Sequence, residues 1–129
     1  MKKIILICSL TMASACSAAH SAEITAEDPL HCATGLEIYS KLALYSGDEK
    51  LSQGYRARGY WFARKAVSLA GKDLSRETTD RLVSIMVDDV DGTLRLVEEC
   101  IRIQDADPEF QAILESNRQR RLERGDTAP

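Results

Sequence analysis

The fold is decided by residues 28–71, which read DPLHCATGLEIYSKLALYSGDEKLSQGYRARGYWFARKAVSLAG. This stretch opens with Asp28, a helix-capping residue, directly before Pro29, which suits the first helical position. Gly47 and Gly71 each follow a run of helical residues, where a left-handed C-terminal cap is wanted. The pattern predicts two helices joined by a short turn.

The rest of the chain carries the same signals. Asp107 and Pro108 repeat the capping pair, and Gly125 follows the last helical run. No stretch shows the strict alternation of a half-buried strand. The sequence therefore predicts an all-α fold, a small up-and-down bundle of about four to five helices. These are expected near 29–46, 49–70, 75–104 and 108–124.

Apolar residues recur at helical spacing and mark the faces that should be buried. A second stripe on the helix near 49–70 consists of small residues, which would let another helix approach closely: Gly59, Ala63, Ala66 and Ala70. The larger residues expected in the core are Cys32, Leu36, Tyr39, Ala43, Leu51, Tyr55, Phe62, Leu69, Val83, Met86, Val90, Val97 and Ile101.

The N-terminus has the order of a secretory signal: two lysines, an apolar run and a small-residue exit. The apolar run is too short to span a bilayer as a permanent helix. We expect a signal peptide over 1–22, cleaved near 19 or 22, and a periplasmic or secreted protein. A helical domain would follow over 23–117, with a polar, Arg-rich C-terminal tail over 118–129.

An alternative is a lipid-anchored envelope protein. The segment 12–16, Met-Ala-Ser-Ala-Cys, loosely resembles the box at which bacterial lipoproteins are cleaved and lipidated. Ala13 stands where that family usually has Leu. We favour ordinary cleavage, with Cys16 discarded; lipidation of Cys16 would tether the same domain to a membrane.

Only two of the four cysteines are expected in the folded part, because Cys8 and Cys16 lie in the export segment. In an oxidising compartment, the remaining Cys32 and Cys100 are most simply a disulfide. Closing so long a loop would stabilise the fold by roughly 4 kcal/mol. A metal site or a reactive thiol is a weaker interpretation, because no second Cys or His lies at ligand spacing from either cysteine.

The disulfide conflicts with a straight helix over 75–104, although the apolar positions there keep one helical phase. In an up-down-up arrangement Cys32 lies level with the start of that helix, and Cys100 would lie about 37 Å along it. A disulfide requires Cα atoms within about 7 Å. We therefore expect a break at Asp91-Gly92, where the aspartate caps a short helix over 93–104.

Charge excludes some partners. The chain has 17 basic and 20 acidic residues, a net charge of −3. Nucleic-acid binding requires concentrated Lys and Arg, so none is expected. No second apolar stretch is long enough for a transmembrane span.

One motif resembles an EF-hand loop. Asp89, Asp91 and Glu98 fall at its third, fifth and twelfth places, but the first place is Val87 and the ninth is Arg95. Acid-before-base pairs four residues apart on a solvated helix face explain the same residues. We favour that interpretation over a weak calcium-binding module.

Trp61 is the only tryptophan, and cations surround it at helical spacings: Arg58, Arg64 and Lys65. An aromatic residue ringed by cations is a possible contact for an acidic protein or anionic surface. The alternative, which we favour, packs Trp61 under the C-terminal helix. His31 is expected at the surface or in a cap. With no catalytic constellation in the sequence, we expect neither an enzyme nor a cofactor.

Cys32, the segment SGDEKLSQGYRARGYWFARK (46–65), Asp73-Leu74 and Cys100 together resemble a group of small exported bacterial proteins. The resemblance spans roughly 30–101 and implies a helical fold and a Cys32–Cys100 bridge, but no activity. Our interpretation is a non-catalytic interaction, inhibitor or accessory protein of the cell envelope, whose partner is another envelope protein. The oligomeric state stays open.

Overall fold

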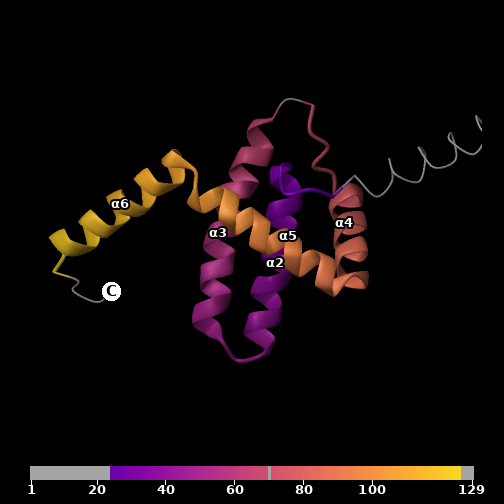
Figure 1. Cartoon of the computed structure of the whole chain (residues 1–129), viewed down its shortest axis with the longest axis horizontal. Coiled ribbons are helices and arrows are strands. Elements are labelled where there is room, and N and C mark those ends of the chain that lie inside the picture. The colour runs from indigo at the N-terminus through magenta and orange to yellow at the C-terminus, as the bar shows by residue number, and fades with distance from the viewer. Residues whose placement is uncertain (1–23, 70, 126–129) are drawn as a thin grey trace, which may run out of the picture.

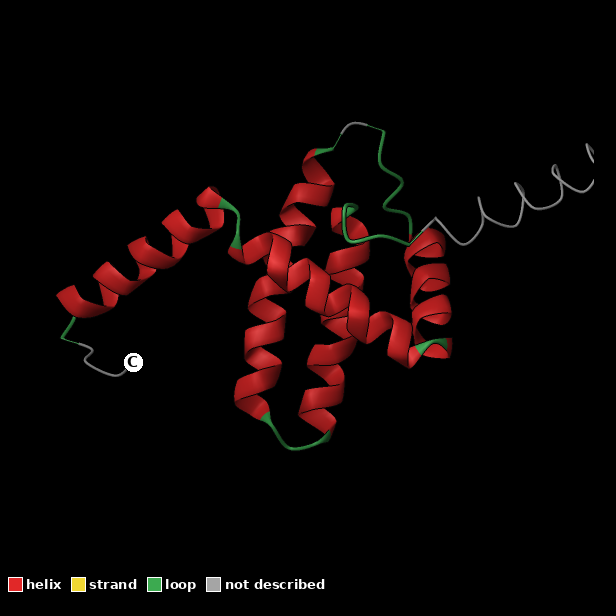
Figure 2. Ribbon diagram, viewed as in Figure 1, coloured by secondary structure: helices red, strands yellow, loops and turns green. Residues whose placement is uncertain are grey.

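The computed structural model describes residues 24–69 and 71–125 (Figure 1). The predicted signal peptide and Cys16 lie outside these residues. Within them the chain is all-helical, and the predicted fold class is confirmed (Figure 2). The helices are α2 (Pro29–Tyr45), α3 (Glu49–Ser68), α4 (Arg76–Asp88), α5 (Val90–Asp105) and α6 (Pro108–Glu123).

Helices α2 and α3 form an antiparallel hairpin, and the local sequence explains its turn. Gly47 takes a φ of 84°, which ends α2, and the Asp48 side chain accepts a hydrogen bond from the Leu51 N–H to begin α3. Between the helices, the buried Ser40 hydroxyl donates to the Ser52 carbonyl oxygen at 2.9 Å. Small polar residues at this contact let the two helices approach closely.

The helix predicted over 75–104 is broken, but two residues earlier than expected. Asp89, not Asp91, is the cap: its carboxylate accepts a hydrogen bond from the Gly92 N–H at 2.9 Å. The Thr93 hydroxyl, within 2.7 Å of the Met86 carbonyl oxygen, ties the two helices together. A Cβ on Gly92 would overlap the Asp89 carboxylate, so the missing side chain makes room for the cap.

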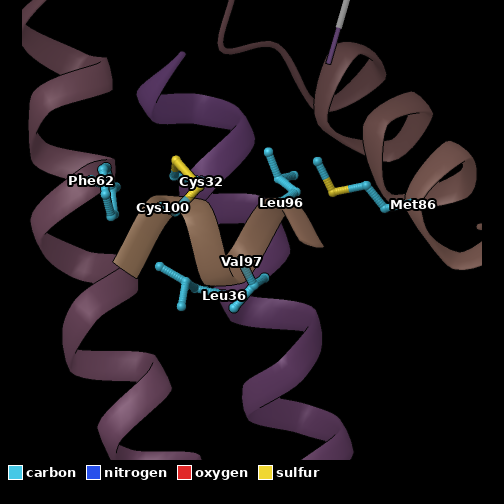
Figure 3. Packing of buried hydrophobic residues seen from close by; sticks show 7 residues of the cluster. All are labelled: Cys32, Leu36, Phe62, Met86, Leu96, Val97 and Cys100. Carbon is cyan, nitrogen blue, oxygen red and sulfur yellow. A yellow bond between two sulfur atoms is a disulfide. The ribbon is translucent and has the colours of Figure 1, made fainter. Parts of the chain in front are cut away.

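After this break, α5 lies obliquely across the hairpin, and the Cys32–Cys100 disulfide joins it to α2. The Cα atoms of the two cysteines are 5.7 Å apart, and both side chains are fully buried. Figure 3 shows the surrounding core, which draws on α2, α3, α4 and α5. Its buried members are Cys32, Leu36, Phe62, Met86, Leu96, Val97 and Cys100.

Helix α5 passes close to α2 at Gly35. A Cβ there would lie 3.1 Å from the Val97 side chain and 3.5 Å from that of Leu96. Gly59, the glycine expected to allow close approach, would place a Cβ no nearer than 3.5 Å to Leu36. Of these two glycines, Gly35 is therefore the one where the crossing tolerates a side chain less.

Some expected core positions are exposed. Leu51 lies in the first turn of α3, Leu69 is its C-cap and Val90 is the first residue of α5, so all three lie beyond the crossing. On α4, Val83 was expected in the core, but Leu82 is buried and Val83 is exposed. The buried side of this helix therefore includes the residue before the predicted one. Leu82 joins Leu30, Ala66 and Ile24 in a second, smaller cluster.

Helix α6 leads away from the other helices (Figure 1). Phe110 is its one buried residue, and every residue from 111 to 125 is exposed. Its start is fixed because the Asp107 carboxylate accepts hydrogen bonds from the Glu109 and Phe110 N–H groups. None of the helices in residues 24–69 and 71–125 combines the length and the apolar character that a membrane crossing needs.

Candidate functional site

The residue singled out in the sequence, Trp61, borders an open hollow between α3, the start of α2 and the start of α6. We call this the Trp61 hollow. Its volume is about 580 Å³, and its lining combines apolar and charged side chains. They are Glu27, Pro29, Trp61, Arg64, Lys65, Ser68, Leu69, Glu109 and Ile113.

Aromatic and cationic neighbours hold the Trp61 ring in place. The Phe62 and Phe110 rings meet it edge to face, with centroids 5.0 and 5.5 Å away. The Lys65 ammonium lies 4.1 Å from the centre of the Trp61 ring, within the range of a cation–π contact. Trp61 stays partly exposed, so the ring that these neighbours hold is still accessible.

Two of the predicted contact cations take part in internal interactions. The Arg58 guanidinium donates to Gln104 Oε1 and Asp105 Oδ1, both at 2.8 Å, and lies 5.5 Å from the centre of the Phe110 ring. Lys65 Nζ is 3.3 Å from Asp107 Oδ2. These contacts position the start of α6 on α3 and α5.

The predicted residues therefore divide into two sets. Trp61, Arg64 and Lys65 line the hollow, whereas Arg58 lies with α5 and Phe110. Arg64 is exposed, and it forms no ion pair within the described part of the chain. Arg64 is thus the cation best placed to meet an anionic group.

The candidate calcium ligands are not brought together. The Asp89 carboxylate caps α5, while Asp91 and Glu98 lie on the exposed side of that helix near Tyr39. Burial, with smaller effects from Tyr55, Asp91 and Glu98, raises the pKa of Tyr39. Across residues 24–69 and 71–125, no group of three or more His, Cys, Asp or Glu side chains is arranged to hold a metal ion.

His31 was expected at the surface or in a cap; it is buried near the start of α2, and the capping side chain is that of Asp28. Its Nδ1 accepts a hydrogen bond from the Thr25 N–H at 3.1 Å, and its Nε2 lies 3.5 Å from Asp28 Oδ2. Asp28 also pairs with Lys72. His31 therefore ties the segment before α2 to the start of that helix.

Gln104 is a fully buried polar residue that sequence reasoning missed. Its amide nitrogen donates to the Arg58 carbonyl oxygen at 3.2 Å, and its oxygen accepts from the Arg58 guanidinium. The signal for it was weak, because a Gln at the end of an apolar helix face is ordinarily solvated. Comparisons with protein-family models, curated proteins and solved structures found no match.

Proposed function

We propose that the protein is exported to the periplasm and binds another protein of the cell envelope at the Trp61 hollow. The order of the N-terminal residues supports export, as does the Cys32–Cys100 disulfide, since such bonds persist in oxidising compartments. Binding is proposed in place of catalysis because the hollow offers a fixed aromatic surface and cations.

The observation that carries the proposal is the fixed, partly exposed ring of Trp61. A tryptophan held by Phe62, Phe110 and Lys65 loses little conformational freedom when a partner covers it. Buried aromatic anchors beside arginine are the residue types that dominate binding energy at protein interfaces. The hollow presents Trp61 next to Arg64.

The charges of the hollow indicate the chemistry of the partner. Arg64 lies exposed at its rim, while Lys65 is already paired with Asp107 and Glu109. A partner that inserts an apolar side chain against Trp61 and places a carboxylate beside Arg64 would match this pattern. We therefore propose a partner with an acidic rim around an apolar projection.

A photo-crosslinking amino acid at position 68, in place of the exposed Ser68 that lines the hollow, tests the binding site in cells. We expect a defined adduct with an envelope protein, and loss of that adduct when Trp61→Ala is added. The control is the same crosslinker at Gln53, an exposed residue nearer the other end of α3. No adduct at position 68, or equal adducts at both positions, would disprove the proposed site.

Mass spectrometry of the purified native chain tests export. We expect an N-terminus near residue 20 or 23 and unlabelled Cys32 and Cys100 when thiols are probed without reduction. A chain that retains residues 1–22 in the cytoplasm contradicts export. A lipid-modified Cys16 at the N-terminus would instead establish the membrane-anchored alternative.

A further inference from the structure

We infer that the protein forms a two-fold dimer in which α6 of each copy lies on the exposed side of α5 of the other. The inference goes beyond the proposed function, because it uses surfaces outside the Trp61 hollow. Two unpartnered surfaces of this chain carry it: one apolar and basic, the other apolar and acidic.

The first surface, which we call the α6 distal face, is one side of α6 beyond Phe110. Its residues line a shared shallow depression and are all exposed: Leu114, Asn117, Arg120, Arg121 and Arg124. The Arg120 guanidinium donates to Asn117. Among the described residues, Arg121 and Arg124 have no ion-pair partner. The face therefore offers a leucine and unpaired cations.

The opposite side of α6 has different chemistry. Helical spacing places Glu115, Gln119 and Glu123 there, and Glu115 pairs with Arg118 at 2.9 Å. A helix of 16 residues is marginally stable by itself in water, and contacts to Phe110 hold only its first turn. The distal face thus gains most from a partner with acidic and apolar groups.

The second surface, which we call the α5 strip, has that composition. Val90, Asp91, Leu94 and Glu98 follow helical spacing along the exposed side of α5. Val90 is 58% and Leu94 39% exposed, and neither acid has an ion-pair partner within residues 24–69 and 71–125. Arg95 and Arg102 flank the strip, and Arg102 pairs with Glu99.

The positions of these surfaces favour a reciprocal contact. Helix α6 leads away from the other helices, whereas α5 crosses the hairpin and begins beside α4 (Figure 1), so the α6 distal face and the α5 strip do not meet within one copy. Two copies related by a two-fold axis can make both contacts at once, which closes the assembly. Each contact places leucine near apolar side chains and arginines near Asp91 and Glu98.

Sedimentation velocity of the mature chain tests the dimer. We expect a species of twice the monomer mass at micromolar concentration in low salt. Because the contacts pair opposite charges, raising the salt concentration should dissociate the dimer. The charge reversals Arg121→Glu/Arg124→Glu and Asp91→Lys/Glu98→Lys should each raise the dimer Kd at least tenfold. An equimolar mixture of the two variants should restore the dimer, since each supplies the charge that the other lost.

The control matched to Arg121→Glu/Arg124→Glu is Lys50→Glu/Arg56→Glu, which makes the same change in charge on exposed residues of α3 and should leave the Kd unchanged. Circular dichroism of each variant checks that it is folded, and Leu114→Asp provides a second way to disrupt the contact. A wild type that stays monomeric at 100-fold higher concentration overturns the inference, as does a mixture that stays monomeric. Binding of a monomeric wild type to phosphatidylglycerol vesicles would assign α6 to a membrane and also overturn it.

The crosslinking experiment at position 68 separates this inference from the proposed function. Arg64→Glu should abolish the envelope-protein adduct and leave the dimer intact. Arg121→Glu/Arg124→Glu should do the opposite. Failure of one result therefore leaves the other in place.

Discussion

Helices α5 and α6 have the same length, 16 residues, yet α5 buries five of them and α6 buries one. Both begin at a capping aspartate, and both carry arginine near the C-terminal end. The difference lies in the residues after the cap: α5 keeps one side apolar as far as Cys100, whereas α6 replaces its apolar side with arginines after Leu114. Capping signals specify a helix, but the length of the apolar side specifies whether it packs.

One of the two largest expected effects comes from removing the disulfide bond that holds α5. Cys32→Ala/Cys100→Ala should lower the free energy of unfolding by roughly 4 kcal/mol, because the bond closes a long loop. Urea unfolding followed by circular dichroism measures it. A loss below about 1 kcal/mol would mean that α5 is held by its side-chain packing alone.

The next comparison sets a core ring against the anchor of α6. Phe62→Ala should cost about 3–5 kcal/mol, because it removes a large buried side chain from the main core. Phe110→Ala should cost less than half as much and expose the α6 amides to hydrogen exchange. Hydrogen exchange followed by mass spectrometry measures the stability loss and the exposure of the α6 amides in each variant. Equal losses would show that α6 unfolds together with the other helices.

The two Asp-Pro caps allow a matched test with pH. Burial raises the pKa of Asp28, but the hydrogen bonds from Lys72 and the Leu30 N–H outweigh it, so the pKa lies below its usual value. A lowered pKa stabilises the fold above about pH 4, and that contribution is lost as the pH falls through the folded-state pKa. Asp28→Ala should therefore cost about 1–2 kcal/mol at pH 7 and less at pH 3.

Asp107 is the counterpart of Asp28 at the start of α6. The effect of burial, which raises its pKa, is outweighed by hydrogen bonds from the Glu109 and Phe110 N–H groups and from Lys65, so the pKa is lowered here too. Asp107→Ala should nevertheless change the unfolding midpoint little, because it releases only α6. A loss as large as that of Asp28→Ala would contradict the contrast between the two regions.

The smallest effect concerns glycines on the hairpin. Gly35→Ala should lower stability by about 1 kcal/mol, because the new methyl group crowds Val97 where α5 crosses α2. Gly59→Ala meets only ordinary contacts and should be neutral or stabilising by up to about 1 kcal/mol, since alanine favours helix. Thermal melts of the two variants compare them directly. The opposite order would place the close approach on α3.

The sequence is sufficient to predict the helices, the caps Asp28 and Asp107 and the disulfide, since each depends on residues close in the chain or on cysteine pairing. The break before α5 is also predictable, because Cys32 and Cys100 could not otherwise meet. The predicted position of the break is wrong. Asp91 directly precedes Gly92, whereas Asp89 lies three residues before it, and only that spacing lets the carboxylate reach the Gly92 N–H.

Features that depend on tertiary geometry are not predictable in this way. The burial of Leu82 in place of Val83 follows from how α4 turns against α2, and that of Gln104 from the angle at which α5 meets Arg58. For the candidate site, the sequence identifies Trp61 and its cations. It does not separate Arg64, which lines the hollow, from Arg58, which is paired with Asp105.

The complete burial of both cysteine sulfurs has a kinetic consequence. The Ala26 carbonyl oxygen lies 3.2 Å from Cys32 Sγ, so the segment before α2 covers the bond on one side while α5 covers it on the other. A thiol reductant must attack along the axis of the sulfur–sulfur bond, and it gains access only when one of these covers opens. The rate of reduction in the absence of denaturant therefore measures how often the segment or α5 lifts away.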